Sequence, residues 1–241
     1  MQTFDLNALV RENAYPGRGI VLGLVPSGKT AVIAYFIMGR SANSRNRIFD
    51  PIKGGIRTVA ADPAKLEDPS LIIYNPVLTL DSCHIVTNGD QTNTIYDFMK
   101  DGKSFEDALR TRTFEPDGPN WTPRISGLVH LREDGMRYKL SILKSADGNG
   151  GSTRRYFFEY PQPVAGEGHF IHTYKCDGSP IPSFEGEPEK VAVCEDVEQF
   201  AADLWANLNA DNKVSLFVRS ISLESGEVKD RIFNKYDAVC E

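Results

Sequence analysis

Short apolar runs, bounded by turn-forming residues, make up most of the chain, and they are rich in β-branched and aromatic side chains. Runs of this length and composition are typical of β-strands. Turn formers such as Pro26-Ser27-Gly28 and Asp134-Gly135 separate them. The pattern predicts strands over residues 19–24, 30–38, 71–74, 84–87, 125–131, 138–143 and 155–160.

Helical spacing appears in only a few segments. Ser104 can cap a helix that runs to Arg112, because Asp107 stands in the capping-box position. A short helix over residues 94–100 precedes it, and Asp196 can cap a third helix in which apolar residues recur at helical spacing. Many strands with few helices predict an α+β fold built on large, mainly antiparallel sheets.

Residues 23–30, G-L-V-P-S-G-K-T, match the phosphate-loop pattern G-x-x-x-x-G-K-[ST]. That motif binds phosphate only when a helix starts at the lysine, because the amide groups of the helix N-terminus hold the phosphates. Here a β-branched and aromatic run follows instead, which is typical of a strand. We therefore predict a hairpin turn at Pro26-Ser27-Gly28, with Lys29 and Thr30 opening the second strand.

The bulk composition is that of a globular enzyme: of 241 residues, 41% are hydrophobic and 25% are charged. The net charge of −6 argues against nucleic-acid and anionic-membrane binding, which need an extended basic surface. Residues 39–57 differ, because they hold five cationic side chains against Asp50 alone, a local balance of +4. This segment predicts a small anionic ligand, although a solvated basic surface would have the same composition.

No apolar run approaches the roughly 20 residues that span a bilayer, and residues 1–11 lack the charged-then-apolar pattern of a signal peptide. The four cysteines form no C-x-x-C pair, which favours free thiols over a metal or redox motif. His169 and His172 would point to opposite faces of a strand, so a metal pair is not expected. We expect a cytoplasmic protein that binds neither nucleic acid nor membrane.

Polar motifs stand between the apolar runs at residues 39–47, 74–76, 87–94 and 114–124. In the first, Arg40, Arg45 and Arg47 follow a predicted strand, and the arginine fork suits a phosphate or carboxylate, with Ser44 as a hydroxyl donor. The third motif holds short amides and hydroxyls around Gly89, which lets the backbone approach a ligand closely. The same amides and hydroxyls could instead cap the next helix.

The fourth motif carries Glu115 and Asp117 ahead of N-W-T-P-R, which ends at Arg124. A carboxylate near a tyrosine can move protons during addition to a carbonyl group and loss of water. Asp117-Gly118-Pro119 is also ordinary turn chemistry. The loop-like residues 175–190 are either a linker or a segment that passes over such a site, and we favour the second interpretation. Together the motifs are typical of a small-nucleotide site, with cations for an anion and amides and hydroxyls for a heterocycle.

Five stretches between Tyr15 and Ile125 keep a common order: Y-P-G-R-G-I-V-L-G, G-R-S-A-N-S-R, Y-N-P, V-T-N-G-D-Q-T-N-T-I and E-P-D-G-P-N-W-T-P-R-I. In these stretches the chain resembles the archaeal-type, single-domain inosine monophosphate (IMP) cyclohydrolases. The resemblance implies one domain over residues 1–241, with residues 1–14 as an N-terminal extension. It also implies an αββα sandwich of four layers, like that of the N-terminal-nucleophile hydrolases. Because the chain begins Met1-Gln2, we expect this fold to be used without a terminal nucleophile.

The same resemblance implies the final step of purine synthesis, ring closure of 5-formamidoimidazole-4-carboxamide ribotide (FAICAR) to IMP with loss of water, without metal or cofactor. The carboxamide nitrogen is a poor nucleophile and must be held against the formyl carbon. For that chemistry we predict Tyr74 and Arg124 as donors to the formyl oxygen and Glu115 as the proton relay. The predicted phosphate ligands are Arg40, Arg45 and Ser44, with Arg47 as the alternative. The other predicted substrate contacts are Asn75, Asn88, Asp90, Thr92, Asn120 and Thr122.

Two other functions fit the same motifs. A non-catalytic purine-nucleotide-binding protein would bind IMP without turnover. A phosphate-loop ATPase built on Gly28-Lys29-Thr30 would hydrolyse ATP with magnesium and lose that activity on substitution of Lys29. For the cyclohydrolase and the nucleotide-binding protein alike, the partner is a small purine nucleotide, and a strand-rich chain of this size can also form a homo-oligomer.

Overall fold

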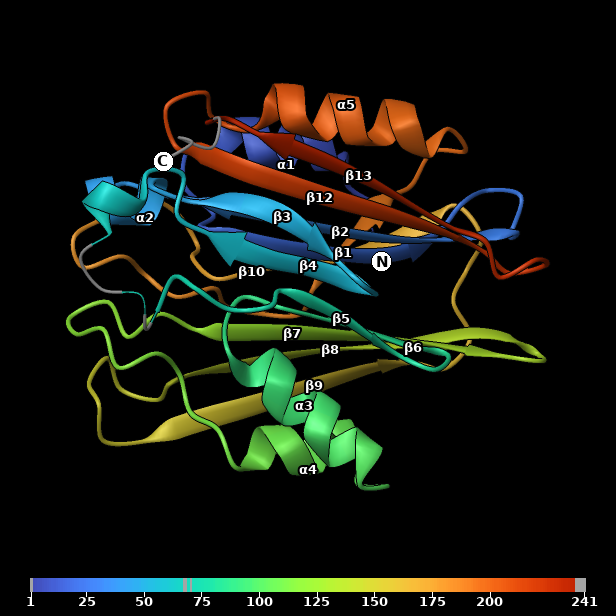
Figure 1. Ribbon diagram of the computed structural model, residues 1–241, viewed down its shortest axis with the longest axis horizontal. Coiled ribbons are helices and arrows are strands. Elements are labelled where there is room, and N and C mark those ends of the chain that lie inside the picture. Colours follow the sequence, from blue (N-terminus) through green and yellow to red (C-terminus); the bar gives the residue numbers. More distant parts are fainter. Residues whose placement is uncertain (1, 67–68, 70, 237–241) are drawn as a thin grey trace.

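Two antiparallel sheets lie face to face and carry helices on their outer sides (Figure 1). The computed structural model describes residues 2–66, 69 and 71–236. The six-stranded sheet has the order β11 (Glu189–Ala192), β10 (Glu167–His172), β1 (Arg18–Leu24), β2 (Thr30–Met38), β12 (Lys213–Ser222) and β13 (Val228–Asn234). The seven-stranded sheet has the order β3 (Ile48–Ile52), β4 (Gly55–Val59), β5 (Val77–Leu80), β6 (Cys83–Thr87), β7 (Arg124–Arg132), β8 (Gly135–Ser145) and β9 (Thr153–Tyr160).

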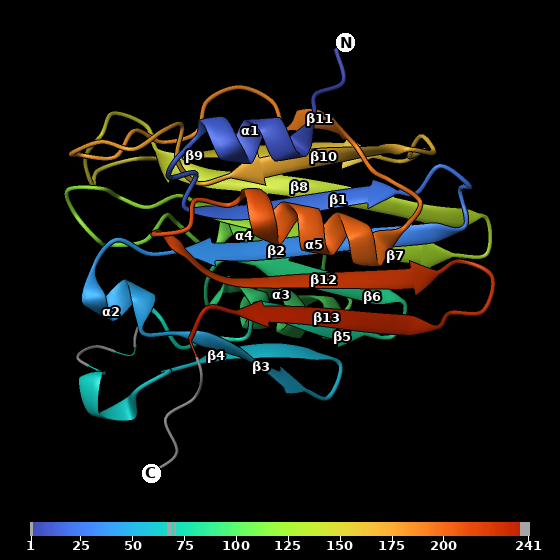
Figure 2. The same cartoon turned by 90° about the horizontal axis from the view of Figure 1, so that it is seen from above.

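Helices form the two outer layers (Figures 1 and 2). The six-stranded sheet is covered by α1 (Leu6–Glu12) and α5 (Val197–Asn207), and the seven-stranded sheet by α3 (Gln91–Lys100) and α4 (Phe105–Arg110). The short helix α2 (Ala42–Arg45) and the 3-10 turn η1 (Pro63–Lys65) lie outside these layers. The predicted α+β class and four-layer αββα arrangement are confirmed, whereas the likeness to N-terminal-nucleophile hydrolases stays a prediction. In the described part of the chain, no helix is long and apolar enough to cross a membrane.

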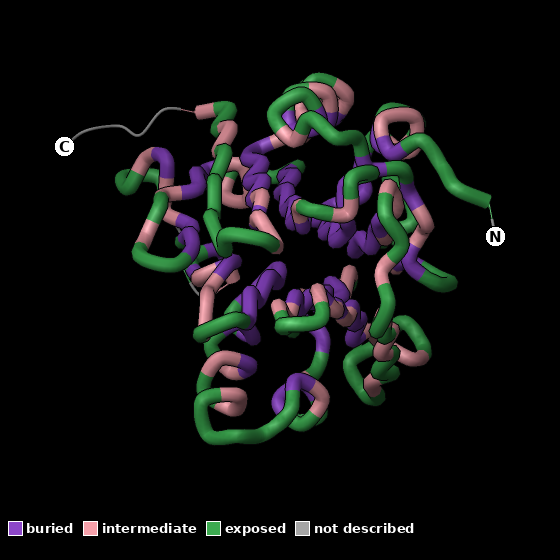
Figure 3. The backbone as a smooth tube through the Cα atoms, turned by 90° about the vertical axis from the view of Figure 1, so that its right-hand side faces the viewer, coloured by how far each residue is buried: buried purple, intermediate pink, exposed green. Residues whose placement is uncertain are grey.

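The central strands β1 and β2 are buried on both faces, because one face packs on the opposite sheet and the other under the helices. Ile20 and Leu22 pack with Val129 of β7 between the sheets, whereas Val21 packs with Leu204 of α5 on the outer side. Buried residues follow the two sheets, and the connecting loops are largely exposed (Figure 3). This double burial explains why both strands are continuous apolar runs without alternation.

Most of the predicted elements are present. Six of the seven predicted strands lie within β1, β2, β6, β7, β8 and β9. The predicted capping box is confirmed, because Ser104 Oγ accepts from the amide of Asp107 at 3.1 Å and Asp107 Oδ2 accepts from the amide of Ser104 at 3.2 Å. Asp196 caps α5 as predicted, accepting from the amide of Gln199 at 3.0 Å.

The strand predicted over residues 71–74 is wrong. The amides of Ile72 and Ile73 donate to Pro69 O at 3.1 and 2.9 Å in a turn, and the hydroxyl of Thr58 donates to Ile72 O at 2.7 Å. These bonds satisfy the segment without a strand partner. The pattern also did not identify α1, α2 and seven strands, most of which are short or carry charged residues, namely β3, β4, β5, β10, β11, β12 and β13.

The phosphate-loop match is a β-hairpin turn, as predicted. The amide of Gly28 donates to Val25 O at 2.8 Å and the amide of Val25 to Thr30 O at 3.0 Å, while β1 and β2 pair on either side. Gly28 has φ +71°, the left-handed region in which glycine carries no steric cost. Because Thr30 begins a strand, no helix N-terminus is present to hold phosphates.

A Gly28→Ala substitution tests this turn. A methyl group would meet only Ala165 Cβ at 3.8 Å, so the cost is that of the left-handed backbone alone. We expect urea denaturation to give a free energy of unfolding lower by about 1 kcal/mol. The matched control, Lys29→Ala, changes an exposed side chain and should leave stability and nucleotide binding unchanged. Loss of nucleotide binding in the Lys29→Ala protein would contradict the hairpin assignment.

Candidate active site

The polar motifs meet at one end of the sandwich, between the two sheets. There β1 begins, β2 and β10 end, and α2 follows directly after β2 (Figures 1 and 2). Buried polar side chains gather at this end from both sheets, including Arg18, Arg47, Glu115, Thr122 and Arg124. The antiparallel order of the strands therefore brings together residues that lie more than a hundred positions apart in the sequence.

Two buried arginines are the most unusual feature of this end. Arg47 has an exposed fraction of 0%, and its Nε donates to Ser44 O at 2.8 Å. Within the described residues, Arg47 Nη1 and Nη2 and Arg18 Nε have no hydrogen-bond partner. Buried guanidinium donors without an acceptor are costly, so they indicate a place built for an anion or a polarised oxygen.

The surroundings shift the pKa values of these two arginines in opposite directions. Burial lowers the pKa of Arg47, and the positive charge of Arg18 lowers it further. Burial would also lower the pKa of Arg18, but the nearby Glu115 carboxyl and the Tyr174 hydroxyl raise it above its ordinary value. Glu115 is therefore the main opposing charge for Arg18, whereas Arg47 forms no ion pair in the part of the chain that the structure describes, which favours an anionic ligand there.

Two tyrosines face the arginines. The hydroxyls of Tyr35 on β2 and Tyr74 are 2.8 Å apart, and both side chains are buried. Burial raises the pKa of Tyr74, although Arg47 and Arg18 oppose the shift, so the phenol is a neutral donor at physiological pH. Thr58 fixes Tyr74, because its amide donates to Tyr74 O at 2.9 Å and its hydroxyl oxygen accepts from the amide of Tyr74 at 2.8 Å.

Glu115 supplies the buried carboxyl of the site, with an exposed fraction of 2%. Burial raises the pKa of Glu115 to about 7, against the opposing charges of Arg18, Arg124 and Arg47, and the carboxylate of Asp117 adds to the rise. A carboxyl that titrates near neutral pH can both take up and release a proton under working conditions.

A second polar cluster lies beside Glu115. Thr122 Oγ1 is hydrogen-bonded to Asp117 Oδ2 and lies 2.5 Å from the hydroxyl of Tyr174. The Tyr174 ring stacks on Tyr15 with centroids 5.7 Å apart, and the guanidinium of Arg40 lies 5.2 Å from the centre of the Tyr15 ring. These rings form a wall that leads from the buried groups to the surface.

The predicted phosphate ligands are divided by the structure. Arg40 lies at the rim with its side chain 37% exposed, and its Nη1 donates to Asp177 Oδ1 at 2.5 Å. Arg45 donates instead to Gly39 O at 2.9 Å and Asn212 Oδ1 at 3.2 Å, and Ser44 Oγ donates to Ser41 O at 3.0 Å. Arg47 is thus the member of the motif that reaches the interior, while Arg45 and Ser44 shape the loop.

The other predicted residues form a network between α3 and β7. Arg124 donates to Gln91 Oε1 at 2.6 Å and pairs with Asp90 at 2.7 Å. The Asn88 side chain donates to Pro123 O at 2.9 Å and accepts from the amide of Ile125 at 2.8 Å, and Thr92 Oγ1 lies 2.7 Å from Thr87 Oγ1. Two amides lie elsewhere: Asn75 donates to Asn93 at 3.2 Å, and Asn120 Oδ1 accepts from Ile181 at 3.2 Å.

Arg18, Tyr35 and Tyr174 were not predicted as site residues. A signal for Arg18 exists in the sequence, because it is a charged residue between Gly17 and Gly19 at the start of an apolar strand. A Cβ on Gly17 would meet Thr173 Oγ1 at 2.3 Å, and one on Gly19 would meet Phe36 at 2.4 Å, so both positions require glycine. Tyr35 lies within an apolar run and gives no such signal.

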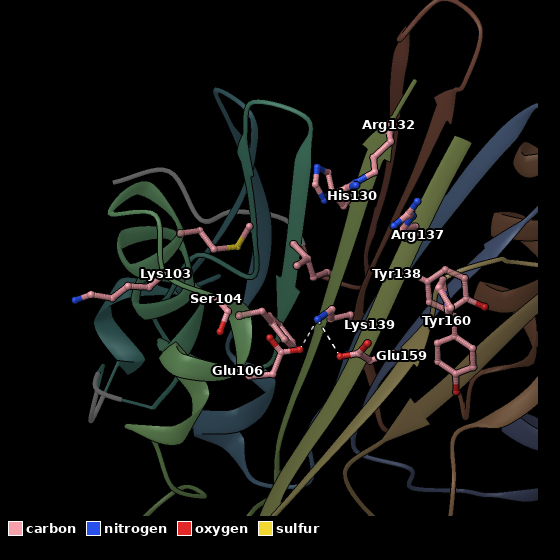
Figure 4. Close-up of a pocket in the computed structure, with 14 residues that line it drawn as sticks. Lys103, Ser104, Glu106, His130, Arg132, Arg137, Tyr138, Lys139, Glu159 and Tyr160 are labelled. Atoms are coloured by element: carbon pink, nitrogen blue, oxygen red, sulfur yellow. Dashed lines mark hydrogen bonds and ion pairs between the residues drawn. The ribbon is translucent and has the colours of Figure 1, made fainter. Parts of the chain in front are cut away.

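A separate groove of about 370 Å³ lies on the outer side of the seven-stranded sheet, beside α4 (Figure 4). Its central cation, Lys139, bonds Glu106 at 2.5 Å and Glu159 at 3.0 Å. This pairing attaches α4 to the sheet, and among the described residues the buried cationic donors without a partner belong to Arg18 and Arg47, not to the groove. The candidate active site is therefore the end of the sandwich.

Comparison with known proteins gives a consistent family. A family model described as IMP cyclohydrolase-like protein matches residues 15–226, which include Arg18, Arg47, Tyr74 and Glu115. The chain is similar to the IMP cyclohydrolase of Methanopyrus kandleri, with 27% identity over 195 residues, or 71% of this chain and 89% of the relative. It is also similar to the IMP cyclohydrolases of Methanosphaera stadtmanae, with 31% identity over 50% of this chain and 60% of the relative, and of Methanococcus maripaludis, with 33% over 54% and 70%.

The buried Glu115 predicts a pH dependence of stability. Its pKa is raised to about 7 in the folded protein, so the folded state holds the proton that the unfolded state loses above its ordinary, lower value. Between pH 5 and pH 8, the free energy of unfolding of the wild type should therefore fall by about 2–3 kcal/mol relative to that of Glu115→Gln, whose side chain cannot ionise. Chemical denaturation of both proteins across this pH range measures the difference. Parallel pH profiles for the two proteins would contradict the raised pKa.

Proposed function

We propose that this chain, which belongs to the IMP cyclohydrolase-like family, closes the purine ring of FAICAR to give IMP and water. The observation that carries the proposal is a buried carboxyl, Glu115, that titrates at about pH 7 beside two buried arginines. The named relatives support the reaction, and the geometry supports the way in which this chain would perform it.

The reaction sets three requirements. The carboxamide nitrogen must be held against the formyl carbon while a carbon–nitrogen bond forms and the formyl oxygen gains negative charge. One proton then leaves each of the two substrate nitrogens, and both end in the departing water. The enzyme therefore has to orient one substrate, stabilise charge on one oxygen and move two protons without net gain or loss.

Glu115 meets the proton requirement. As a carboxylate it takes the proton of the carboxamide nitrogen during attack, and as a carboxylic acid it returns that proton to the former formyl oxygen, which becomes a hydroxyl group. In a second cycle it takes the proton of the formamide nitrogen and gives it to that hydroxyl, which leaves as water when the carbon–oxygen bond breaks. Arg18 and Arg124 keep the ionised form accessible, because their charges oppose the effect of burial on the pKa of Glu115. A group that must serve as base and acid in one turnover works best when its pKa lies near the working pH.

Arg47 and Tyr74 stabilise the negative charge that develops on the formyl oxygen. Arg47 brings two N–H donors that have no acceptor within the described residues, and Tyr74 brings a neutral hydroxyl held by Tyr35. Preorganised donors of this kind act where charge develops in the transition state. Arg124, bound to Gln91 and Asp90, acts on the charge of Glu115 more than on the substrate oxygen.

The ribotide phosphate would lie toward the rim. Arg40 is the most accessible arginine of its motif, and the Tyr15 ring beneath it supports the guanidinium. Asn75 and Asn120, which are partly exposed, would meet the heterocycle. Six predicted residues would act indirectly by shaping the walls, because their hydrogen bonds hold together the loops and the α3–β7 network: Ser44, Arg45, Asn88, Asp90, Thr92 and Thr122.

A purine nucleotide is thus the proposed partner, and the proposed role is the last step of purine synthesis. That role implies a cytoplasmic enzyme, and assembly into a homo-oligomer is compatible with it. Both points stay predictions.

The proposed roles predict the kinetics of two variants. Glu115→Gln should lower kcat by about 10²–10⁴-fold, because proton transfer is lost, while IMP binding is retained. Arg47→Gln should lower kcat by about 10²–10³-fold through loss of charge stabilisation. The measurement is an ultraviolet assay of IMP formation from FAICAR with EDTA-treated protein, together with calorimetric titration of IMP.

Glu106→Gln, in the groove of Figure 4, is the matched control and should keep wild-type turnover. Full turnover by Glu115→Gln would remove Glu115 from the mechanism. If the wild-type protein bound IMP but formed none from FAICAR, the chain would be a nucleotide-binding protein that lacks the catalytic activity.

A further inference from the structure

Two hydrogen bonds within residues 115–122 close the loop that carries Glu115. The amide of Glu115 donates to Thr122 O at 2.9 Å, and Asp117 Oδ1 accepts from the amide of Thr122 at 2.6 Å. Trp121 holds φ +46°, in the left-handed region, and Gly118 and Gly150 leave room for its ring. A non-glycine residue keeps such a conformation only where its surroundings determine it, so residues 115–122 form a fixed support.

The hydrogen bonds in this loop have a defined direction. Thr122 Oγ1 donates to Asp117 Oδ2, so the single hydroxyl proton of Thr122 points toward that carboxylate oxygen. Thr122 Oγ1 then accepts from the hydroxyl of Tyr174, 2.5 Å away. The result is an ordered chain from Tyr174 through Thr122 to Asp117, which connects the aromatic wall of the site to the Glu115 loop.

Asp117 also acts through its charge. No ion pair of Asp117 is present in the part of the chain that the structure describes. The charged groups that influence Glu115 are Arg18, Arg124 and Arg47, which all favour its ionised form, and Asp117, which favours the protonated form. Asp117 is thus the one acidic neighbour among them, and it opposes three arginines.

We propose that Asp117 is a positioning residue for Glu115: it aligns the Glu115 loop through Thr122 and Tyr174, and its negative charge keeps a proton available on Glu115 for the departing hydroxyl. Asp117 does not touch the substrate in this assignment. The inference rests on the proposed cyclohydrolase function and concerns which of the two carboxylates in this loop transfers protons. Glu115 transfers them, and Asp117 makes that transfer possible near neutral pH.

Two variants separate the charge of Asp117 from its hydrogen bonds. Asp117→Asn removes the charge, so the acid limb of the kcat/KM profile should move to lower pH by about one pH unit. Thr122→Val keeps the charge but breaks the chain to Tyr174, so kcat should fall by about 10-fold with the acid limb unmoved. Asp134→Asn is the control, since Asp134 lies exposed beside Arg137 on the β7–β8 turn, and it should change neither quantity.

A direct titration makes the test independent of turnover. The carboxyl carbon of Glu115, observed by ¹³C NMR in wild-type and Asp117→Asn protein, should titrate at lower pH in the variant. If both proteins titrate alike and share one pH profile, Asp117 only closes a turn and the proposal fails. If Asp117→Asn folds but has no turnover at any pH, Asp117 itself transfers protons and the proposal also fails. Absence of wild-type turnover would instead count against the proposed function, and the NMR comparison would still decide the effect of Asp117 on Glu115.

Discussion

The dry interior between two doubly covered sheets is the constraint on which the site depends. Because helices cover the outer faces and the inner faces pack on each other, the space between the sheets excludes water along β1 and β2. Any ionisable group placed at the end of that space loses solvation, and its pKa moves toward the neutral form. The raised pKa values of Glu115 and Tyr74 and the lowered pKa of Arg47 follow from this position in the fold.

Glycine positions and backbone hydrogen bonds hold these buried ionisable side chains in place, although their burial is unfavourable. Gly17 and Gly19 let β1 approach Thr173 and Phe36 closely enough to bring Arg18 into the interior. Thr58 binds both backbone groups of Tyr74, and the carbonyl oxygen of Thr122 accepts from the amide of Glu115. The candidate site therefore combines strand residues with loop residues whose main-chain groups are hydrogen-bonded, which leaves the side chains free to face one another.

The family resemblance predicted the layers and the residue pattern predicted the central strands, and physical reasons explain what both missed. Periodicity identified the central strands because burial on both faces makes them apolar throughout, and the absence of a helix after Lys29 correctly excluded a phosphate loop. The strand predicted over residues 71–74 failed because a turn at Pro69 and the hydroxyl of Thr58 supply its hydrogen bonds. Tyr35 could not be predicted as a site residue. A tyrosine within an apolar strand has the same sequence pattern whether or not its hydroxyl meets a hydrogen-bond partner such as Tyr74 in the fold.

Burial of an arginine does not by itself mark a functional site, as Arg219 in the same interior demonstrates. Arg219 on β12 is 3% exposed, yet it bonds both oxygens of Asp230 at 2.7 Å and Thr79 of the opposite sheet at 2.9 Å. Its charge, after burial, helps to lower the pKa of His84 to about 4, so that ring is a neutral neighbour. Arg219 is satisfied and joins the sheets, whereas Arg47 has donors without acceptors in the described residues. Since an unsatisfied buried donor costs stability, its presence at the end that also holds Glu115 agrees with the proposed use of Arg47 in binding and catalysis.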